Sequence, residues 1–284
     1  EISLGLVGSE MCIRDRFMVN KNLYTLLTCL LLTGCDLIDY HPYDVRISGE
    51  TDVNAHNIEQ IEAKCKGKTT IRFITMGDSQ RWYDETEDFV KEVNKRDDID
   101  FVIHGGDMSD FGLTKEFLWQ RDIMNGLKVP YVALIGNHDC LGTGAETYQA
   151  VFGPANFSFI AGNVKFVCLN TNALEYDYSE PIPNFSFMEE ELTARADEFE
   201  KTVVSMHAHP FADVFNDNVA KPFQYYVTQY PGLQFCTAAH NHGFDDRVLF
   251  DDDVHYIVSD CMKSRSYLVF TITPEKYEYE LVEY

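Results

Sequence analysis

Five short polar segments, each directly after an apolar run, limit what this chain can fold into. They are MGDSQ at 76–80, GGDMSD at 105–110, GNHD at 136–139, MHAHP at 206–210 and AHNH at 239–242. The runs before them, IRFIT, FVIH, YVALI, TVVS and the shorter LQFCT, are typical of buried strands. The polar segments would then stand at strand ends, on a rigid frame that suits metal ligands. One such segment would be weak evidence, but five in succession indicate a metal site.

The spacing inside two segments places pairs of donors on one side of the chain. In an extended chain, positions i and i+2 point the same way, so Asp78 and Gln80 can approach one point, as can His240 and His242. Two divalent cations about 4 Å apart repel by roughly 17 kcal/mol at an effective dielectric constant near 20. A bridging anion would offset that repulsion, and Asp107 suits this role.

Strand and helix patterns alternate in the first half of the chain. The strand runs are separated by amphipathic stretches at 85–96 and 114–127, which favours a largely parallel sheet with ligands at the carboxyl ends of the strands. The sequence after 156 predicts a hairpin that turns at Gly162-Asn163, and residues 186–201 predict a helix. The last third reads as a strand-rich meander. Two sheets flanked by helices would form an α/β fold, a four-layer αββα sandwich.

The five segments resemble the motif series of the calcineurin-like metallophosphoesterases, which runs D-x-H, G-D, G-N-H-D/E, H and G-H-x-H. The resemblance covers roughly residues 69–284 and implies the same sandwich of two mixed sheets. It also implies a metal-dependent phosphoester hydrolase with a dinuclear metal centre and a metal-activated water or hydroxide as nucleophile. The chain departs from the pattern at Gln80, where His is usual, and at Ala239, where Gly usually precedes the final H-x-H.

By this resemblance, each metal ion has four ligands and one carboxylate is shared. The first set is Asp78, Gln80, Asp107 and His242, and the second is Asp107, Asn137, His207 and His240. His138 would face the substrate, to protonate the leaving oxygen or stabilise transition-state charge, and Asp139 would orient His138 from behind. Arg81 and His209 are further candidates for substrate contact, with a surface ion pair as an equal alternative for Arg81.

The residue at position 80 bears on which metals bind. An amide oxygen is a harder ligand than an imidazole nitrogen, so Gln80 favours manganese or iron, with magnesium and zinc as alternatives. The exchange leaves the charge of the site unchanged, because both side chains are neutral donors. We therefore expect a weaker first metal site, not an absent one.

Residues 1–68 have their own sequence character. LVGSEMCIRD at Leu6–Asp15 matches the translation of a sequencing-library adapter, so we interpret residues 1–17 as an assembly artefact. Residues 18–34 contain a basic residue and an apolar run too short to span a bilayer, and LTGC at 32–35 resembles a bacterial lipobox, so we interpret 18–34 as a lipoprotein signal peptide. Cleavage before Cys35 would leave a lipid on its thiol, although an ordinary secretory signal is the alternative. Residues 35–68 would then form an acidic tether with a short helix around Val53–Cys65, ahead of a metallophosphoesterase domain at 69–284.

These features predict an exported, membrane-anchored bacterial lipoprotein on the periplasmic or cell-surface side. The net charge of −23 argues against an extended nucleic acid as partner but not against a small phosphate ester, because bound metal ions dominate the local field. Two other functions stay open: a nuclease, and a non-catalytic scaffold whose support is Gln80 and Ala239. Nothing in the pattern specifies an oligomeric state.

The cysteines beyond position 35 specify no disulfide, because they are odd in number and irregularly spaced. Cys168 and Cys236 lie in apolar runs, which predicts buried thiols that act as small hydrophobic groups. The set is Cys65, Cys140, Cys168, Cys236 and Cys261.

Overall fold

The computed structural model describes residue 41, residues 44–173 and residues 181–284. The chain divides into two units, Glu1–Pro42 and Tyr43–Tyr284, and every element below belongs to the second. The predicted artefact at 1–17, the signal at 18–34 and the lipidation site at Cys35 lie outside the described residues. Within the described ranges, no helix has the length and hydrophobicity needed to cross a membrane.

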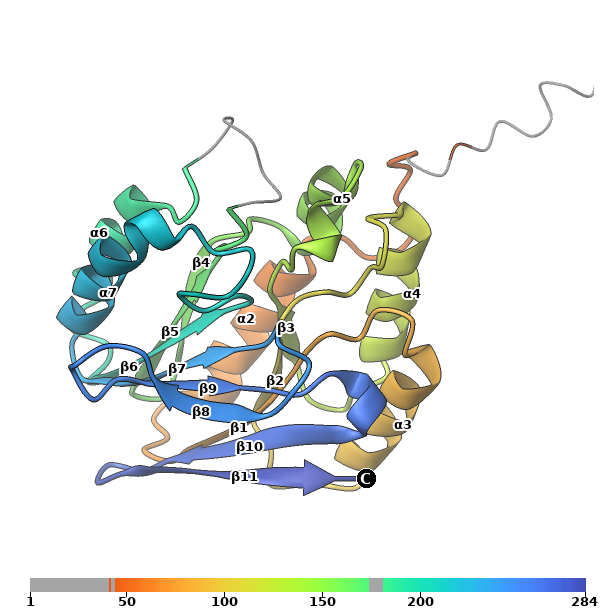
Figure 1. The fold of residues 1–284 in the computed structure, drawn as a ribbon. Coiled ribbons are helices and arrows are strands. Elements are labelled where there is room, and N and C mark those ends of the chain that lie inside the picture. Colours follow the sequence, from red (N-terminus) through yellow and green to blue (C-terminus); the bar gives the residue numbers. More distant parts are fainter. Residues whose placement is uncertain (1–40, 42–43, 174–180) are drawn as a thin grey trace, which may run out of the picture. The chain divides into compact units, whose positions relative to one another are not determined.

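The first sheet has the strand order β11-β10-β1-β2-β3 (Figure 1). Its strands are β1 (Ile71–Met76), β2 (Phe101–His104), β3 (Tyr131–Ala133), β10 (Ser266–Ile272) and β11 (Tyr277–Glu283). The first three are parallel, as the alternation of strand and helix predicts, whereas β10 runs antiparallel to β1 and β11 antiparallel to β10. The carboxyl ends of β1, β2 and β3 therefore meet at one edge of this sheet.

The second sheet has the order β4-β5-β6-β7-β9-β8. Its strands are β4 (Phe157–Ala161), β5 (Val164–Leu169), β6 (Lys201–Met206), β7 (Leu233–Ala238), β8 (Asp245–Val248) and β9 (His255–Val258). Strands β5, β6, β7 and β9 are parallel, and the outer strands β4 and β8 are antiparallel to their neighbours. Both sheets are thus mixed, as expected.

Aromatic side chains fill the space between the sheets. Alternate residues of a strand face opposite sides, so Phe73 of β1 packs between the sheets while Ile74 packs under the helices. The ring of Phe73 stacks on Phe101 with centroids 5.2 Å apart, and it meets Phe166 of the second sheet edge-on at 5.0 Å. These contacts fix how the two sheets face each other, which matters because both carry polar segments at their strand ends.

Helices cover the outer faces of the two sheets (Figure 1). Helices α3 (Tyr83–Val93), α4 (Thr114–Met124) and α5 (Gly144–Phe152) pack on the first sheet, and α6 (Phe185–Glu191) and α7 (Ala220–Gln229) pack on the second. Short 3-10 helices lie at η2 (His138–Cys140), η3 (Asp217–Val219) and η4 (Met262–Ser264). Helix, sheet, sheet and helix form the four-layer αββα sandwich that the sequence predicts.

Helix α2 (Val53–Cys65) has the predicted bounds and packs against β3 and β4, so the predicted tether segment contributes to the same core. Asn54 on this helix satisfies both backbone groups of Ala133 in the edge strand β3. Its Oδ1 accepts from the Ala133 N–H at 2.8 Å, and its Nδ2 donates to the Ala133 carbonyl at 2.9 Å. At Ala133, the Asn54 side chain therefore supplies the two hydrogen bonds that a further strand at this edge would supply.

Some predicted elements differ from the structure. The hairpin between β4 and β5 turns at Gly162-Asn163 as predicted, but the helix predicted at 186–201 ends at Glu191. The buried ammonium of Lys165 takes the carbonyl oxygens of Glu191 and Ala194, each at 2.7 Å, which the next helical turn would otherwise use. The last third is strand-rich, as predicted, but it does not form one meander: β8 and β9 join the second sheet, and β10 and β11 join the first.

Candidate active site

All five polar segments lie at the carboxyl ends of strands. Three follow β1, β2 and β3 of the first sheet, and two follow β6 and β7 of the second. Hydrogen bonds join the loops: Asp78 N–H donates to the Gly106 carbonyl at 3.0 Å, and His240 N–H donates to Asp78 Oδ2 at 2.9 Å. The second bond joins a loop of one sheet to a loop of the other, so the two sheets contribute to one site.

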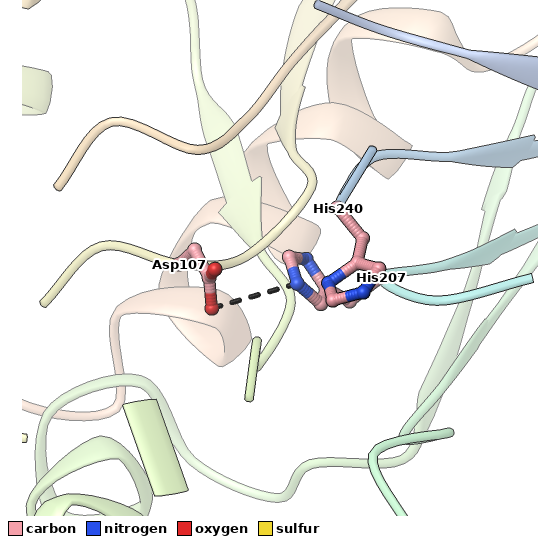
Figure 2. A group of neighbouring side chains, drawn as sticks. All are labelled: Asp107, His207 and His240. Carbon is pink, nitrogen blue, oxygen red and sulfur yellow. Dashed lines mark ion pairs between the residues drawn. The ribbon is translucent and has the colours of Figure 1, made fainter. Parts of the chain in front are cut away.

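The side chains predicted for the second metal ion meet around Asn137. Its Oδ1 lies 3.1 Å from His207 Nε2 and 3.0 Å from His240 Nδ1. Asp107 Oδ1 lies 3.5 Å from His207 Nε2, the ion pair drawn as a dashed line in Figure 2. His207 Nδ1 donates to the Gly105 carbonyl at 2.8 Å, which fixes the ring and leaves Nε2 for a ligand.

The side chains predicted for the first metal ion meet on the other side of Asp107. Asp78 Oδ1 is 3.2 Å from His242 Nε2, and Gln80 Nε2 donates to Asp107 Oδ2 at 3.4 Å. One ligand atom each from Asp78, Asp107 and His242 lie within 4.8 Å of one another, and the same holds for Asp107 with the two histidines of the second group. The structure thus brings all seven predicted ligands together, with Asp107 common to both groups.

Several of these residues have a left-handed backbone, which is uncommon outside glycine. The φ angle is 51° at Asp78, 57° at Asp107, 71° at His240 and 49° at His242. Each such residue costs roughly 1–2 kcal/mol relative to the right-handed form, and such strain concentrates at functional sites. The fold therefore holds these four side chains in place at a cost in stability.

Small residues allow the loops to approach closely. A Cβ atom at Gly136 would lie 2.1 Å from Asp107 Oδ1, so no other residue fits there without movement. Ala239 fills the space between the two sheets, because a Cβ at Gly77 or Gly105 would lie 2.9 or 3.0 Å from its methyl group. Gly77 and Gly105, which follow strands of the first sheet, leave room for the Ala239 methyl group at the position where the family usually has glycine.

His207 and Asp107 stabilise each other's charged form. Burial lowers the pKa of His207, but Asp107 outweighs burial and raises the pKa to about 9. Burial likewise raises the pKa of Asp107, yet His207 outweighs it and holds the pKa below its usual value. Burial, aided by the charge of His207, lowers the pKa of His240 to about 4. Without a bound cation, the positive charge of this group therefore resides on His207.

A family model described as calcineurin-like phosphoesterase matches residues 71–244, which include all five polar segments. The chain belongs to the calcineurin-like phosphoesterase family. The family resemblance of the five sequence motifs is thereby confirmed. A search of curated proteins found no match.

Solved structures share the fold of this phosphoesterase. A purple acid phosphatase from yellow lupin seeds has a TM-score of 0.58 and 15% identity, over 76% of this chain and 52% of that one. GAP50 of Plasmodium, described as the anchor in the inner membrane complex, has a TM-score of 0.55 and 12% identity, over 76% and 85%. TT1561 of Thermus thermophilus has a TM-score of 0.51 and 13% identity, over 75% and 99%. At such identities the likeness shows the fold alone.

The predicted catalytic residue His138 of the phosphoesterase lies beside the metal-ligand groups, with its side chain 32% exposed. Its Nδ1 donates to the Asp110 carbonyl at 2.9 Å, since a carbonyl can only accept, and the Asp110 carboxylate lies 3.7 Å from the same nitrogen. Asp110 also pairs with Arg81 at 2.5 Å. The ring therefore presents Nε2 to a substrate, and the sequence analysis missed Asp110 although it ends the GGDMSD segment.

The role predicted for Asp139 needs correction. Asp139 does not orient the His138 ring: its carboxylate accepts from the backbone N–H groups of Met108, Ser109 and Gly136 at 2.8–3.0 Å and so ties two ligand loops together. Burial, reinforced by Asp107, raises the pKa of Asp139 to about 6.

His209 is only 2% exposed, and its ring is held by the Pro210 carbonyl and by Asn241 Nδ2, at 2.7 and 2.9 Å. This placement contradicts the expectation that His209 contacts the substrate. Its contact with Asn241 joins the loop of His207 to the loop that carries His240 and His242.

The donor set of this phosphoesterase fits metal ions. Asp78 Oδ1 and Gln80 Oε1 are buried and accept no hydrogen bond from any described residue. Asp78 Oδ1 does have a charged neighbour, because it lies 3.2 Å from His242 Nε2 and pairs with that ring when it is protonated. A buried oxygen that accepts no hydrogen bond, such as Gln80 Oε1, costs about 1–3 kcal/mol, and a bound cation would remove that cost. Both oxygens belong to the set predicted for the first metal ion.

Proposed function

We propose that this phosphoesterase hydrolyses small phosphate esters with two metal ions that share Asp107. The observation that carries the proposal is the convergence of both ligand groups on this carboxylate, next to the buried Gln80 Oε1, which accepts no hydrogen bond from any described residue. Two bound ions would activate a water molecule and polarise the phosphoryl oxygens. Because Gln80 offers an amide oxygen, manganese or iron is favoured over magnesium or zinc.

The residues of the chain supply positioning and proton transfer. Asp107 and His207, which form a buried charge pair in the metal-free protein, would both become ligands, with His207 then bound as a neutral imidazole. His138, in its protonated form, would donate from Nε2 to the leaving oxygen, while the Asp110 carbonyl fixes the ring through Nδ1. Arg81, held by Asp110 on the same side, adds a positive charge that favours an anionic ester.

We also propose that the enzyme is exported and tethered to a bacterial membrane through lipid on Cys35. The LTGC sequence before the cleavage point supports this. Each buried methylene of an acyl chain contributes roughly 0.8 kcal/mol, so two or three chains anchor a protein almost permanently. Labelling with a radioactive fatty acid should mark the wild-type protein and leave a Cys35→Ala variant unlabelled; equal labelling of both would refute the anchor.

Metal stoichiometry tests the two-metal proposal directly. Protein stripped with a chelator and reloaded with excess manganese should bind two ions per chain. His242→Ala should bind one, and Asp107→Asn should lose most of both. His56→Ala, on the exposed face of α2, serves as the control and should keep two. A wild-type protein that binds a single ion under these conditions would rule out the shared-carboxylate scheme.

Hydrolysis of p-nitrophenyl phosphate and of its bis-ester, with manganese added, tests the reaction. His138→Ala should lose about 100-fold or more in kcat while keeping both metal ions, since general acid catalysis contributes roughly 100- to 10,000-fold. Equal rates for both proteins would remove His138 from the mechanism. No hydrolysis with any metal would favour the scaffold, and cleavage of plasmid DNA would favour the nuclease.

A further inference from the structure

Lys263 of η4 is an exposed lysine that pairs with no carboxylate in the described part of the chain. The chain has a net charge of −23, and other exposed basic side chains, such as Lys91, pair with an acidic neighbour. Helix η4 packs beside α3 (Figure 1), yet Glu85 and Asp88 of α3 pair with Arg265 instead, at 3.8 and 2.8 Å. The positive charge of Lys263 is therefore available to a ligand.

The segment that carries Lys263 runs beside the first metal-ligand segment. Gly77 forms an isolated parallel bridge with Cys261, and the Met262 N–H donates to the Asp78 carbonyl at 3.3 Å. Because successive Cα atoms are about 3.8 Å apart, the Lys263 Cα lies within about 9 Å of that carbonyl oxygen. Lys263 therefore adjoins the loop that contributes to the predicted first metal site.

Trp82 holds the Lys263 ammonium beside this loop. The Nζ atom lies 5.6 Å from the centroid of the Trp82 ring, within the range of a cation–π attraction. Trp82 follows Gln80 by two residues, its N–H donates to the Ser79 carbonyl at 3.0 Å, and its ring packs against the core under the first set of helices. A cation that is already held in place loses less conformational freedom when it binds an anion.

We propose that Lys263, held over Trp82, binds a second anionic group of the substrate, so that the preferred esters carry a further phosphate or a carboxylate. The inference rests on the proposed function. Arg81, another cation of this loop, is paired with Asp110, whose carbonyl holds His138, and so lies with the reacting phosphoryl group. The charge of Lys263 is exposed to solvent, so its effect should be modest and should shrink at high salt.

Lys263→Gln removes the charge and keeps much of the side-chain length. We expect its kcat/KM for 3-phosphoglycerate and fructose 1,6-bisphosphate to fall about fivefold, mainly through KM, and less in high salt. With glycerol 3-phosphate and fructose 6-phosphate, which lack the second anionic group, kcat/KM should stay within about twofold, and Lys263→Arg should keep the preference. Lys221→Gln is the matched control, because Lys221 on α7 is also exposed and pairs with no carboxylate of the described residues.

The pattern of loss identifies the second group. A loss confined to fructose 1,6-bisphosphate indicates a phosphate, a loss confined to 3-phosphoglycerate indicates a carboxylate, and a loss with both indicates a site for either anion. The inference is overturned if Lys263→Gln slows all four esters equally, if it slows neither ester with two anionic groups, or if Lys221→Gln has the same effect.

A binding measurement separates this inference from the proposed function. Butylphosphonate, 4-phosphonobutyrate and propane-1,3-diphosphonate, whose P–C bonds are not hydrolysed, are titrated into manganese-loaded protein and followed by calorimetry. Lys263→Gln should bind at least one of the two compounds with two anionic groups about fivefold more weakly than the wild type does, and butylphosphonate equally well. No binding, or equal affinities of both proteins for all three compounds, would overturn the inference even if the esters are hydrolysed. A selective loss of binding without hydrolysis of any ester would refute the proposed function and leave the anion site standing.

Discussion

The contact of Asn54 with Ala133 permits a quantitative prediction for Asn54→Ala. The change removes the hydrogen bond to the Ala133 carbonyl, about 0.5–1.5 kcal/mol, although that oxygen keeps the Tyr148 hydroxyl at 2.7 Å. It also leaves the buried Ala133 N–H without its partner, which costs about 1–3 kcal/mol. Alanine is the better helix former by about 0.6 kcal/mol, so the free energy of unfolding should fall by about 1–4 kcal/mol.

Urea denaturation followed by circular dichroism measures this loss. With a slope of roughly 2–3 kcal/mol per molar urea for a domain of this size, the midpoint should fall by about 1 M. Gln60→Ala, on the exposed side of the same helix, is the control and should change stability by less than about 0.5 kcal/mol. If both variants unfold at the same urea concentration, Asn54 does not replace a strand at the sheet edge.

Three further outcomes follow from the structure. Gln80→His should raise zinc affinity at the first site in chelator competition, and unchanged affinity would show that residue 80 is no ligand. Ala239→Val should lower stability by about 1–3 kcal/mol, because Gly77 leaves no room for added methyls; an unchanged urea midpoint would contradict that packing. Burial raises the pKa of Cys168, and that of Cys65 to about 11, so neither native thiol should react with a disulfide reagent at pH 8 until urea unfolds the chain; rapid labelling would refute their burial.

The sequence predicts the strands that carry the site because each is an apolar run that a polar motif ends. It also predicts α2 with its bounds and the β4–β5 hairpin, whose signals are local. It does not predict where β10 and β11 pair, because alternating apolar residues indicate a strand but not its neighbour. Helices α5 and α7 have no counterpart among the predicted elements, and α6 ends early through a lysine distant in sequence.

For the site, the motif spacing identifies residues that the fold does bring together, and their roles as ligands stay predictions. The hydrogen-bond partner of the His138 ring could not be predicted from this spacing. Helix η2 turns about 120° per residue, so the side chains of His138 and Asp139 point to different sides. Asp139 then faces backbone N–H groups, and Asp110 takes the ring. Side-chain directions in such loops depend on backbone angles that spacing alone does not give.

The pairing of Ile71 with Ile272 has a consequence for synthesis of the chain. Strand β1 carries the first metal-ligand segment and lies between β2 and β10, yet β10 leaves the ribosome long after β1 and β2. Until residues 266–272 emerge, one edge of a central, apolar strand has no partner, and unpaired edges of this kind promote aggregation. A stop codon before residue 266 should therefore yield insoluble protein, not a shortened enzyme, although every residue of the candidate site would be present.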